Sequence, residues 1–345
     1  MDASPIDEPI ASRSTLTMRT NPSLLAVASV LALTASCASP STWRPSETSP
    51  AQPAPARADG IAWEIVDRFR LLKQRGATEE LFRRYASYYA SVRTQVNDAG
   101  VLETHWNAGD GHDGHYDEDY LRIAGWQVRL TAPATGQCVW AIGSPPTTDE
   151  GPCQGHVRRV GVGETRIAVR PKSGSDQTWT TVVHPRDVLI ATLGDSYASG
   201  EGVPDLRGFM FTPARWMDDR CHRSLFSGPG LAALMYAKVN PHVSVTHLTF
   251  ACSGAQLQAG LLHGYDGQVP PRGAKPLPPQ AKELNRVLRE GGRTADYVTL
   301  SFGGNDLGFS DIVTTAAFHG VPELEGDDPA AHRGRAATGP GVAAR

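Results

Sequence analysis

Hydrophobic and polar residues follow several distinct patterns along the chain, and each pattern predicts a different structure. The run LLAVASVLALTAS, residues 24–36, contains 13 residues without a charge. Apolar residues then recur at helical spacing, which predicts one helix from Trp63 to Leu72 and a second from Glu79 to Val96. Between Ile123 and Val183, short alternating runs are separated by turn residues. This pattern predicts several short strands and a small β-sandwich-like domain.

Three further apolar runs have the character of buried parallel strands. They cover Val188–Leu193, Val243–Phe250 and Tyr297–Phe302, and each is followed by a polar turn that contains glycine. The carboxyl ends of parallel strands meet at one edge of a sheet, which is where α/β folds place their sites. We therefore expect an α/β domain in which these three turns lie close together.

The first apolar run identifies an export signal. A membrane-spanning helix needs about 20 apolar residues, so this run is too short to span and fits a secretory signal peptide, with Arg19 as its positive flank. The sequence Thr34-Ala35-Ser36-Cys37 resembles a bacterial lipobox, in which the cysteine is lipidated. The alternative is simple cleavage after Ala38. Both interpretations predict an exported bacterial protein of the cell envelope or the extracellular space. Lipidation would in addition tether the protein to the membrane through Cys37.

Proline, glycine and polar residues divide the rest of the chain. The Pro-rich stretch 38–60 predicts an extended linker after the signal at 1–37. We expect the helical segment and the β-rich accessory domain over 61–185, and the α/β domain over 186–322. The tail 323–345 has almost no large apolar residues and is predicted to be disordered.

Composition limits the classes of function. The 345 residues are 40% hydrophobic and 20% charged, which is ordinary for a soluble globular protein, and the net charge of -3 excludes a nucleic-acid binder that relies on positive charge. If Cys37 leaves the count of five cysteines, four remain for disulfides in an oxidising compartment. We expect Cys138 and Cys153, 15 positions apart in the β-rich region, to pair.

A cluster of acidic and histidine residues in GDGHDGHYDEDY, residues 109–120, invites a metal-site interpretation. The cluster lacks a histidine pair at helical i, i+4 spacing and lacks an intact calcium-loop pattern. We therefore interpret it as a polar surface loop and predict no metal and no cofactor. The residues of this cluster are Asp110, His112, Asp113, His115, Asp117 and Asp119.

The segment DVLIATLGDSYASGEG, residues 187–202, carries the candidate chemistry. A strand, a tight turn and a helix start would place Ser196 at the carboxyl edge of the sheet, a position that suits a nucleophilic hydroxyl. The turns after the other two strands contain Gly254 and Asn305. The backbone N–H of Gly254 and the side-chain amide of Asn305 could then donate to an oxyanion.

These three motifs, GDSYASGEG, the Gly254 turn and GGND, occur in the order of the first three sequence blocks of the SGNH (GDSL) hydrolase family. The resemblance covers about Asp187 to Phe309. It implies a three-layer flavodoxin-like α/β/α fold, here incomplete, and an esterase, lipase or acyl hydrolase. Ser196 would attack an ester carbonyl, with its own N–H as a third oxyanion donor. Resemblance to secreted bacterial members also implies a disulfide between Cys221 and Cys252.

The general base of such a hydrolase is missing from its expected place. The family supplies it from a late Asp-x-x-His motif, whereas only His319 and His332 follow Asn305, and neither has aspartate three positions earlier. His222 and His263 lie nearer the motifs, but no pattern marks either as the base. Our hypothesis is that residues 1–345 are an incomplete reading of a longer hydrolase gene.

Two functions remain open from the sequence. The first is an exported, monomeric serine hydrolase that cleaves carboxylic esters in small molecules, lipids or acylated glycans. The second is a catalytically inactive envelope lipoprotein whose β-rich domain binds a glycan or a protein. For the hydrolase, the turn-rich segments 200–220 and 260–279 are predicted to line the mouth of the site.

Overall fold

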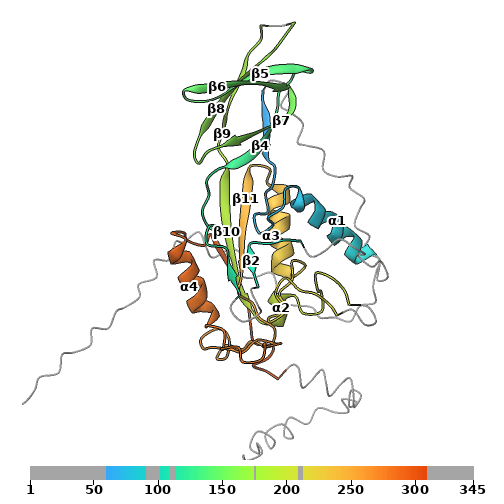
Figure 1. Cartoon of the computed structure of the whole chain (residues 1–345), viewed down its shortest axis with the longest axis vertical. Helices are drawn as coiled ribbons and strands as arrows, with labels where there is room; N and C mark the ends of the chain where they lie inside the picture. The colour runs from blue at the N-terminus through green and yellow to red at the C-terminus, as the bar shows by residue number, and fades with distance from the viewer. Residues whose placement is uncertain (1–59, 91–101, 109–113, 175, 209–212, 309–345) are drawn as a thin grey trace, which may run out of the picture. The chain divides into compact units, whose positions relative to one another are not determined.

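The computed structural model describes residues 60–90, 102–108, 114–174, 176–208 and 213–308, and every structural statement below concerns these residues (Figure 1). Twelve strands and four helices lie in this part of the chain. The signal region with Cys37, nearly all of the predicted linker, the first half of the acidic cluster and the two late histidines, His319 and His332, lie outside the described residues.

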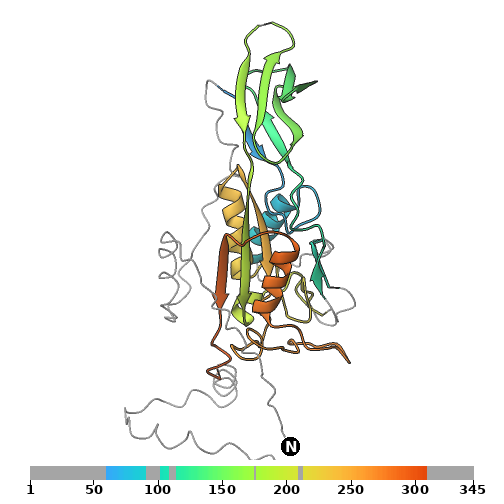
Figure 2. The same cartoon turned by 90° about the vertical axis from the view of Figure 1, so that its left-hand side faces the viewer.

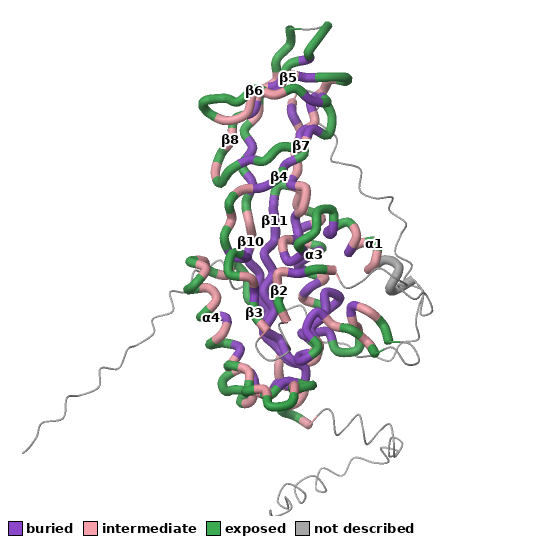
Figure 3. Tube along the Cα trace, in the orientation of Figure 1, coloured by how far each residue is buried: buried purple, intermediate pink, exposed green. Residues whose placement is uncertain are grey.

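Three parallel strands form the sheet that carries the candidate nucleophile. In spatial order they are β11 (Val243–Thr249), β10 (Arg186–Gly194) and β12 (Tyr297–Ser301). Thr192 is aligned with both Thr249 and Thr299, so the three strands end at the same edge, as the sequence predicts. The strand order makes β10 the central strand. Every residue of β11 is buried, as the colours of Figure 3 show, whereas every residue of β12 is exposed.

Helices lie on both faces of this parallel sheet, as Figures 1 and 2 show. Helix α3 (Gly228–Val239) begins where the Ser227 hydroxyl accepts a hydrogen bond from the backbone N–H of Gly230, and it packs on β11. Helix α4 (Gln280–Glu290) packs on β10 from the other side and buries Gln280 and Leu284. The hydrophobic core lies between the strands and these helices.

Seven of the antiparallel strands form two sheets that share one hydrophobic core around Trp140, which we call the Trp140 core. The first sheet consists of β1 (Ala62–Ile65), β4 (Trp126–Thr131) and β7 (Gln154–Val160). The second has the order β6 (Pro146–Pro152), β5 (Gln137–Gly143), β8 (Thr165–Pro171) and β9 (Trp179–Val183). Alternating apolar residues predicted five of these strands. Strand β6 was missed because PTTDEGP contains no large apolar residue.

The helix predicted from Trp63 to Leu72 is wrong. Residues 62–65 form β1, which pairs antiparallel with β4 and places Ile65 in the Trp140 core. Phe69 then forms a parallel bridge with Val245 at the free side of β11 and belongs to the core of the parallel sheet. The apolar residues of this segment therefore serve two different cores, and an extended chain reaches both, whereas a helix would direct them to one.

The second predicted helix is confirmed up to Ala90 as α1 (Ala77–Ala90), which begins two residues earlier than expected, whereas the predicted residues 91–96 lie outside the described residues. Its Glu79 forms an ion pair with Lys238 of α3 (Oε2 to Nζ 3.8 Å), and the same ammonium group lies 3.9 Å from the centre of the Phe82 ring. These contacts join α1 to α3 on one side of the parallel sheet.

The interpretation of residues 109–120 as a polar surface loop is wrong for its two tyrosines. Residues Trp106–Asn107 and His115–Tyr116 form a short hairpin, β2 and β3, and both Tyr116 and Tyr120 are buried. The Tyr116 hydroxyl donates to the carbonyl of Thr249 and accepts from its N–H, and Tyr120 does the same at His247. The two hydroxyls thus satisfy backbone groups along the outer side of β11, a role that composition alone does not reveal.

Both expected disulfides are present. Cys138 bonds to Cys153 inside the Trp140 core, and Cys221 bonds to Cys252 after β11. Two disulfides fit an exported protein. Within the described residues, no helix is both long and apolar enough to cross a membrane.

The fold class is confirmed only in its coarse features. The described residues contain a parallel sheet flanked by helices, but strands outnumber helices and most of them are antiparallel. The parallel sheet has three strands among the described residues, whereas the resemblance implies five. The structure therefore does not show the flavodoxin-like arrangement that the sequence analysis predicts.

Candidate active site

Ser196 lies at the first residue after the turn that ends β10. Asp195 precedes it with an extended backbone and accepts a hydrogen bond from the N–H of Tyr197 (3.1 Å), so it caps the short helix α2 (Ser196–Ser199). Gly200 ends this single turn in the left-handed conformation. Because α2 has only one turn, an oxyanion here would be held by individual N–H groups rather than by a helix dipole.

The backbone before Ser196 is fixed by a side chain that the sequence analysis did not identify. The Gln280 amide accepts from the N–H of Gly194 (2.8 Å) and donates to its carbonyl (2.9 Å), and Gln280 is buried. A Cβ at position 194 would lie 2.3 Å from that of Ala198 and 2.7 Å from the carbonyl oxygen of Ser301. This position therefore accepts only glycine, which explains the first residue of the GDS motif.

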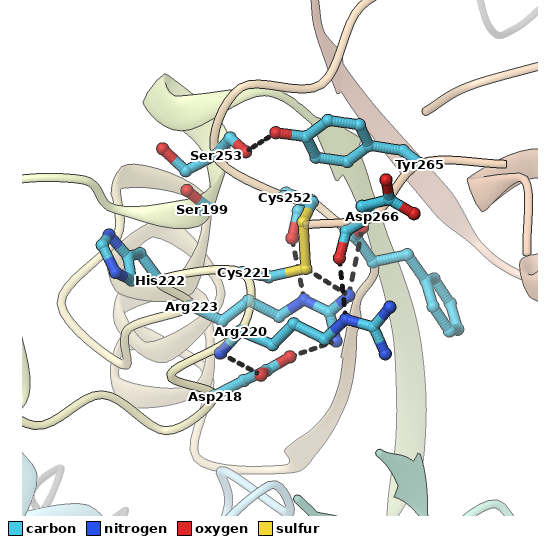
Figure 4. The surroundings of a disulfide bond; sticks show 12 residues. Ser199, Asp218, Arg220, Cys221, His222, Arg223, Cys252, Ser253, Tyr265 and Asp266 are labelled. Carbon is cyan, nitrogen blue, oxygen red and sulfur yellow. Dashed lines mark hydrogen bonds and ion pairs between the residues drawn. A yellow bond between two sulfur atoms is a disulfide. The ribbon is translucent and has the colours of Figure 1, made fainter. Parts of the chain in front are cut away.

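Gly254 lies in the turn after β11 with φ of +82°, a backbone conformation that L side chains rarely adopt. A Cβ there would lie 2.2 Å from the hydroxyl of Tyr265. That hydroxyl donates to the carbonyl of Ser253 (2.9 Å), so Tyr265 fills the space that a side chain at 254 would need (Figure 4). Burial raises the pKa of Tyr265, which keeps it a donor at neutral pH.

Asn305 lies in the turn after β12 and contacts the Gly254 turn. Its side-chain amide donates to the carbonyl of Ala255 (2.9 Å), and the Gln256 amide donates to the Asn305 carbonyl (3.2 Å). Both carboxylate oxygens of Asp306 accept from the N–H of Leu257 (3.1 and 3.2 Å). An asparagine amide has two N–H donors, so one of them is left for a ligand when the other binds Ala255.

The three turns are joined to one another by main-chain hydrogen bonds. The N–H of Asp195 donates to the carbonyl of Ser301 (3.0 Å), and the N–H of Cys252 donates to the carbonyl of Gly194 (3.0 Å). The sheet therefore brings Ser196, Gly254 and Asn305 to one edge, as the strand pattern predicts. What each of them does there is taken up under the proposed function.

Asp195 is expected from the sequence to tie loops together rather than to take part in chemistry. It is buried, and its contacts are backbone N–H groups of Tyr197 and of Gly304. Burial raises the pKa of this carboxyl although both N–H groups oppose the shift. Asp195, and Asp306 at Leu257, therefore make the loop hydrogen bonds that the sequence analysis expects.

A cavity of about 340 Å³ opens beside Ser196. Four of the residues that line it are apolar or aromatic, and Glu201 is the only charged one among the described lining residues. The lining residues are Ser196, Tyr197, Gly200, Glu201, Val203, Phe226, Gly228 and Leu231. The predicted mouth segment 200–220 thus contributes to this cavity, whereas 260–279 lines a smaller one of about 40 Å³ near Cys252.

The loop that follows α2 is held by a buried carboxylate. Asp205 accepts from the N–H groups of Leu225 (2.9 Å) and Met217 (2.5 Å) and from the Ser224 hydroxyl (3.3 Å). Burial raises the pKa of Asp205 to about 7 against these donors. These hydrogen bonds tie the loop after α2 to Met217 and to the segment just before Phe226, which lines the cavity.

A group of three possible metal ligands, His105, Asp117 and Asp119, lies outside this site, with ligand atoms within 4.8 Å of one another. The same Asp117 oxygen already contacts the Lys73 ammonium (2.8 Å) and the His105 ring (2.9 Å). Burial raises the pKa of Asp117, but the hydrogen bonds from Lys73 and His105 outweigh it and lower the pKa overall. An ammonium group in contact with the carboxylate competes with a cation, so this cluster does not support a metal site.

No protein-family model and no curated protein sequence matches this chain. Two solved structures are weakly similar. An extracellular lipase from Streptomyces rimosus is 26% identical over 41% of this chain and 42% of its own length, with a TM-score of 0.23. An active-site mutant of a family two carbohydrate esterase from Clostridium thermocellum is 13% identical over 61% of this chain and 70% of its own, with a TM-score of 0.20.

The chain spans less than half of the length of that lipase. Both TM-scores are below 0.5, so neither similarity carries an argument about fold or reaction. The comparisons establish only that the weak structural neighbours of this chain include a lipase and an esterase.

Proposed function

We propose that this protein is an exported serine hydrolase of the SGNH type that cleaves carboxylic esters. The observation that carries the proposal is the convergence of three turns at one sheet edge, which brings Ser196, Gly254 and Asn305 to that edge. Of these three residues, Ser196 also lines the cavity of about 340 Å³. The motifs in these turns match the first three blocks of that family, whose flavodoxin-like fold we extend to this chain as part of the proposal.

In the proposed reaction, the Ser196 hydroxyl attacks the ester carbonyl and forms a tetrahedral intermediate. The N–H groups of Ser196 and Gly254 and the free N–H of the Asn305 amide stabilise its oxyanion. Loss of one such donor typically costs about 10²–10³ in turnover. Collapse releases the alcohol and leaves an acyl-enzyme, which water then hydrolyses.

The proposed nucleophile also needs a base that takes the proton from Ser196. Within the described part of the chain, no histidine ring is hydrogen-bonded to Ser196. A late histidine is the group the family resemblance implies, and His319 and His332 lie outside the described residues. The base is therefore left open in this proposal.

The cavity suggests the kind of acyl group that the site accepts. Its wall combines the aromatic ring of Phe226 with Val203 and Leu231, which are apolar, and Tyr197 is exposed at its edge. Binding cavities of this size fall within the range used for small organic ligands. We propose esters of small molecules, lipids or acylated glycans with an apolar acyl group as substrates.

The proposal is tested by labelling the purified protein with a fluorophosphonate and by hydrolysis of p-nitrophenyl acetate. We expect labelling and hydrolysis in the wild type, and loss of both in Ser196→Ala. Ser173→Ala is the matched control, because Ser173 is exposed in the turn after β8 and should leave both signals unchanged. An unlabelled wild type, or labelling retained in Ser196→Ala, would overturn the proposal and favour a lipoprotein that only binds a glycan or a protein.

A further inference from the structure

Glu201 contacts both parts of the proposed site, although the sequence analysis gave it no role. Its backbone N–H donates to the carbonyl of Ser196 (3.0 Å), which ties it to the residue that carries the nucleophile. Its side-chain Oε2 accepts from the hydroxyl of Ser253 (2.5 Å), the residue immediately before Gly254. One residue thus links the backbone of the proposed nucleophile to the turn of a proposed oxyanion donor.

The same carboxylate oxygen also contacts His222, whose Nδ1 lies 2.8 Å away. His222 has a φ of +50°, a strained conformation for a residue other than glycine, and its ring stacks on Trp216 with the ring centres 4.6 Å apart. Strain of this kind persists only where surrounding contacts hold it. The contacts of His222 with Glu201 and Trp216 therefore stabilise this strained backbone conformation.

The disulfide between Cys221 and Cys252 links the two segments that contact the Glu201 carboxylate. His222 follows Cys221 and Ser253 follows Cys252, so the disulfide shown in Figure 4 joins the backbones that carry these two residues. The side chains of both residues contact Glu201. The N–H of Ser253 donates to the carbonyl of Cys221 (3.0 Å), and the hydroxyl of Tyr265 donates to the carbonyl of Ser253 (2.9 Å). Ser253 immediately precedes Gly254, and the hydrogen bond that its side-chain hydroxyl makes within the described residues is the one to Glu201.

We propose that Glu201 is a positioning residue of the Ser196 site, which holds the Gly254 turn in place relative to the nucleophile through its contact with Ser253. This inference rests on the proposed esterase function. A carboxylate can accept several hydrogen bonds at once, so one side chain can bind the serine hydroxyl and the imidazole together. Glu201 needs no contact with the reacting atoms for this role.

The test measures p-nitrophenyl acetate hydrolysis by the full chain. Removal of the carboxylate in Glu201→Ala should lower kcat about 10- to 100-fold and change KM less than about threefold, because a displaced donor weakens the transition state more than substrate binding. Glu201→Gln keeps an acceptor of the same shape and should restore most of kcat. Ser253→Ala should reproduce the loss, and the double variant should be no worse than either single variant.

Glu150→Ala is the matched control. Glu150 is an exposed glutamate paired with Lys172 in the antiparallel strands (2.6 Å), so kcat should be unchanged. If Ser196→Ala is inactive while Glu201→Ala and Ser253→Ala retain wild-type kcat, the positioning role is wrong and the proposed function stands. Additive effects of the two substitutions also overturn the role. If Ser196→Ala behaves as the wild type, the proposed function fails and this inference fails with it.

Discussion

The Trp140 core and the site edge of the parallel sheet each contain one disulfide, but they use it differently. Cys138 and Cys153 are fully buried among Trp140 and the aliphatic residues of two antiparallel sheets. Cys221 and Cys252 are buried in a small cluster with Ala255, and the side chains of their neighbours His222 and Ser253 both contact Glu201. We therefore expect the first disulfide to stabilise packing, and the second to stabilise the geometry of the proposed site as well.

This difference predicts that the two regions respond in opposite ways to substitution. Changes in the Trp140 core should lower the free energy of unfolding and leave the chemistry of Ser196 intact as long as the protein is folded. Changes at the site edge should lower activity more than the free energy of unfolding. The predictions below test this separation, beginning with the largest expected effect.

Replacement of Trp140 by alanine should have the largest effect on stability. The ring is completely buried, stacks on His156 with centres 5.1 Å apart, and donates from Nε1 to the carbonyl of Pro152 (3.2 Å). Loss of such a side chain lowers the free energy of unfolding by about 3–5 kcal/mol, measurable by urea denaturation. Trp179→Ala, at a half-buried position of β9, is the control and should cost less. Reduced fluorophosphonate labelling of folded Trp140→Ala would contradict the separation.

Removal of each disulfide compares the two regions directly. In the chain-entropy model, the loop of 15 residues contributes about 3 kcal/mol and the loop of 31 about 4 kcal/mol. We expect Cys138→Ser with Cys153→Ser to lower the melting temperature without changing kcat. Cys221→Ser with Cys252→Ser should lower both, because it releases the backbones that carry His222 and Ser253. Equal kcat values for the two double variants would argue against a role of the second disulfide in the site.

Replacement of Gly254 by alanine should mainly affect activity. The new methyl group would meet the Tyr265 hydroxyl at 2.2 Å and strain a backbone with φ of +82°, so the turn must shift. Displacement of a proposed oxyanion donor should lower kcat about 10²-fold or more. Gly155→Ala is the matched control, because Gly155 also has positive φ (+76°) but open space around it, and it should change stability only. A wild-type rate in Gly254→Ala would exclude this turn from the oxyanion site.

The sequence predicted the strands better than the contacts between them. Alternating apolar residues identify β4 and β8 because one face of each strand is buried. The same reasoning failed for β6, which is exposed along most of its length, and for residues 63–72, whose apolar side chains divide between two cores. The periodicity of apolar residues reveals an element only where one face of it is buried. Segments that lack a single buried face are therefore not identified from this pattern.

The site was predictable as far as it depends on strand ends. A buried run followed by a glycine-containing turn placed Ser196, Gly254 and Asn305 at one edge. The supporting side chains were not predictable, because Gln280 reaches Gly194 across 86 positions and Glu201 reaches Ser253 across 52. Contacts between residues so far apart in the chain produce no spacing pattern in a single sequence. Glu201 does belong to the GDSYASGEG motif, but the motif does not indicate its contact with Ser253.

The smallest expected effect concerns pH, where two buried groups of the α/β part oppose each other. Burial raises the pKa of Asp205 to about 7, from about 4 in an unfolded chain, so its contribution to stability falls as pH rises from about 4 to 7. Burial lowers the pKa of His247 to about 4, from about 6.5, so its contribution falls as pH decreases from about 6.5 to 4. The wild type should therefore show only a small net change over this range.

Single substitutions should separate the two contributions. Asp205→Asn keeps the acceptor for Leu225 and removes the titration, so its free energy of unfolding relative to wild type should increase as pH rises from 4 to 7. His247→Gln should show the opposite trend, with its largest relative gain at pH 4. Urea denaturation at pH 4, 5.5 and 7 measures both trends. Asp205 helps to hold the loop beside the cavity, whereas His247 lies in β11, so Asp205→Asn should also alter the pH dependence of hydrolysis and His247→Gln should not. A shared change in both variants would place the coupling in the sheet rather than in that loop.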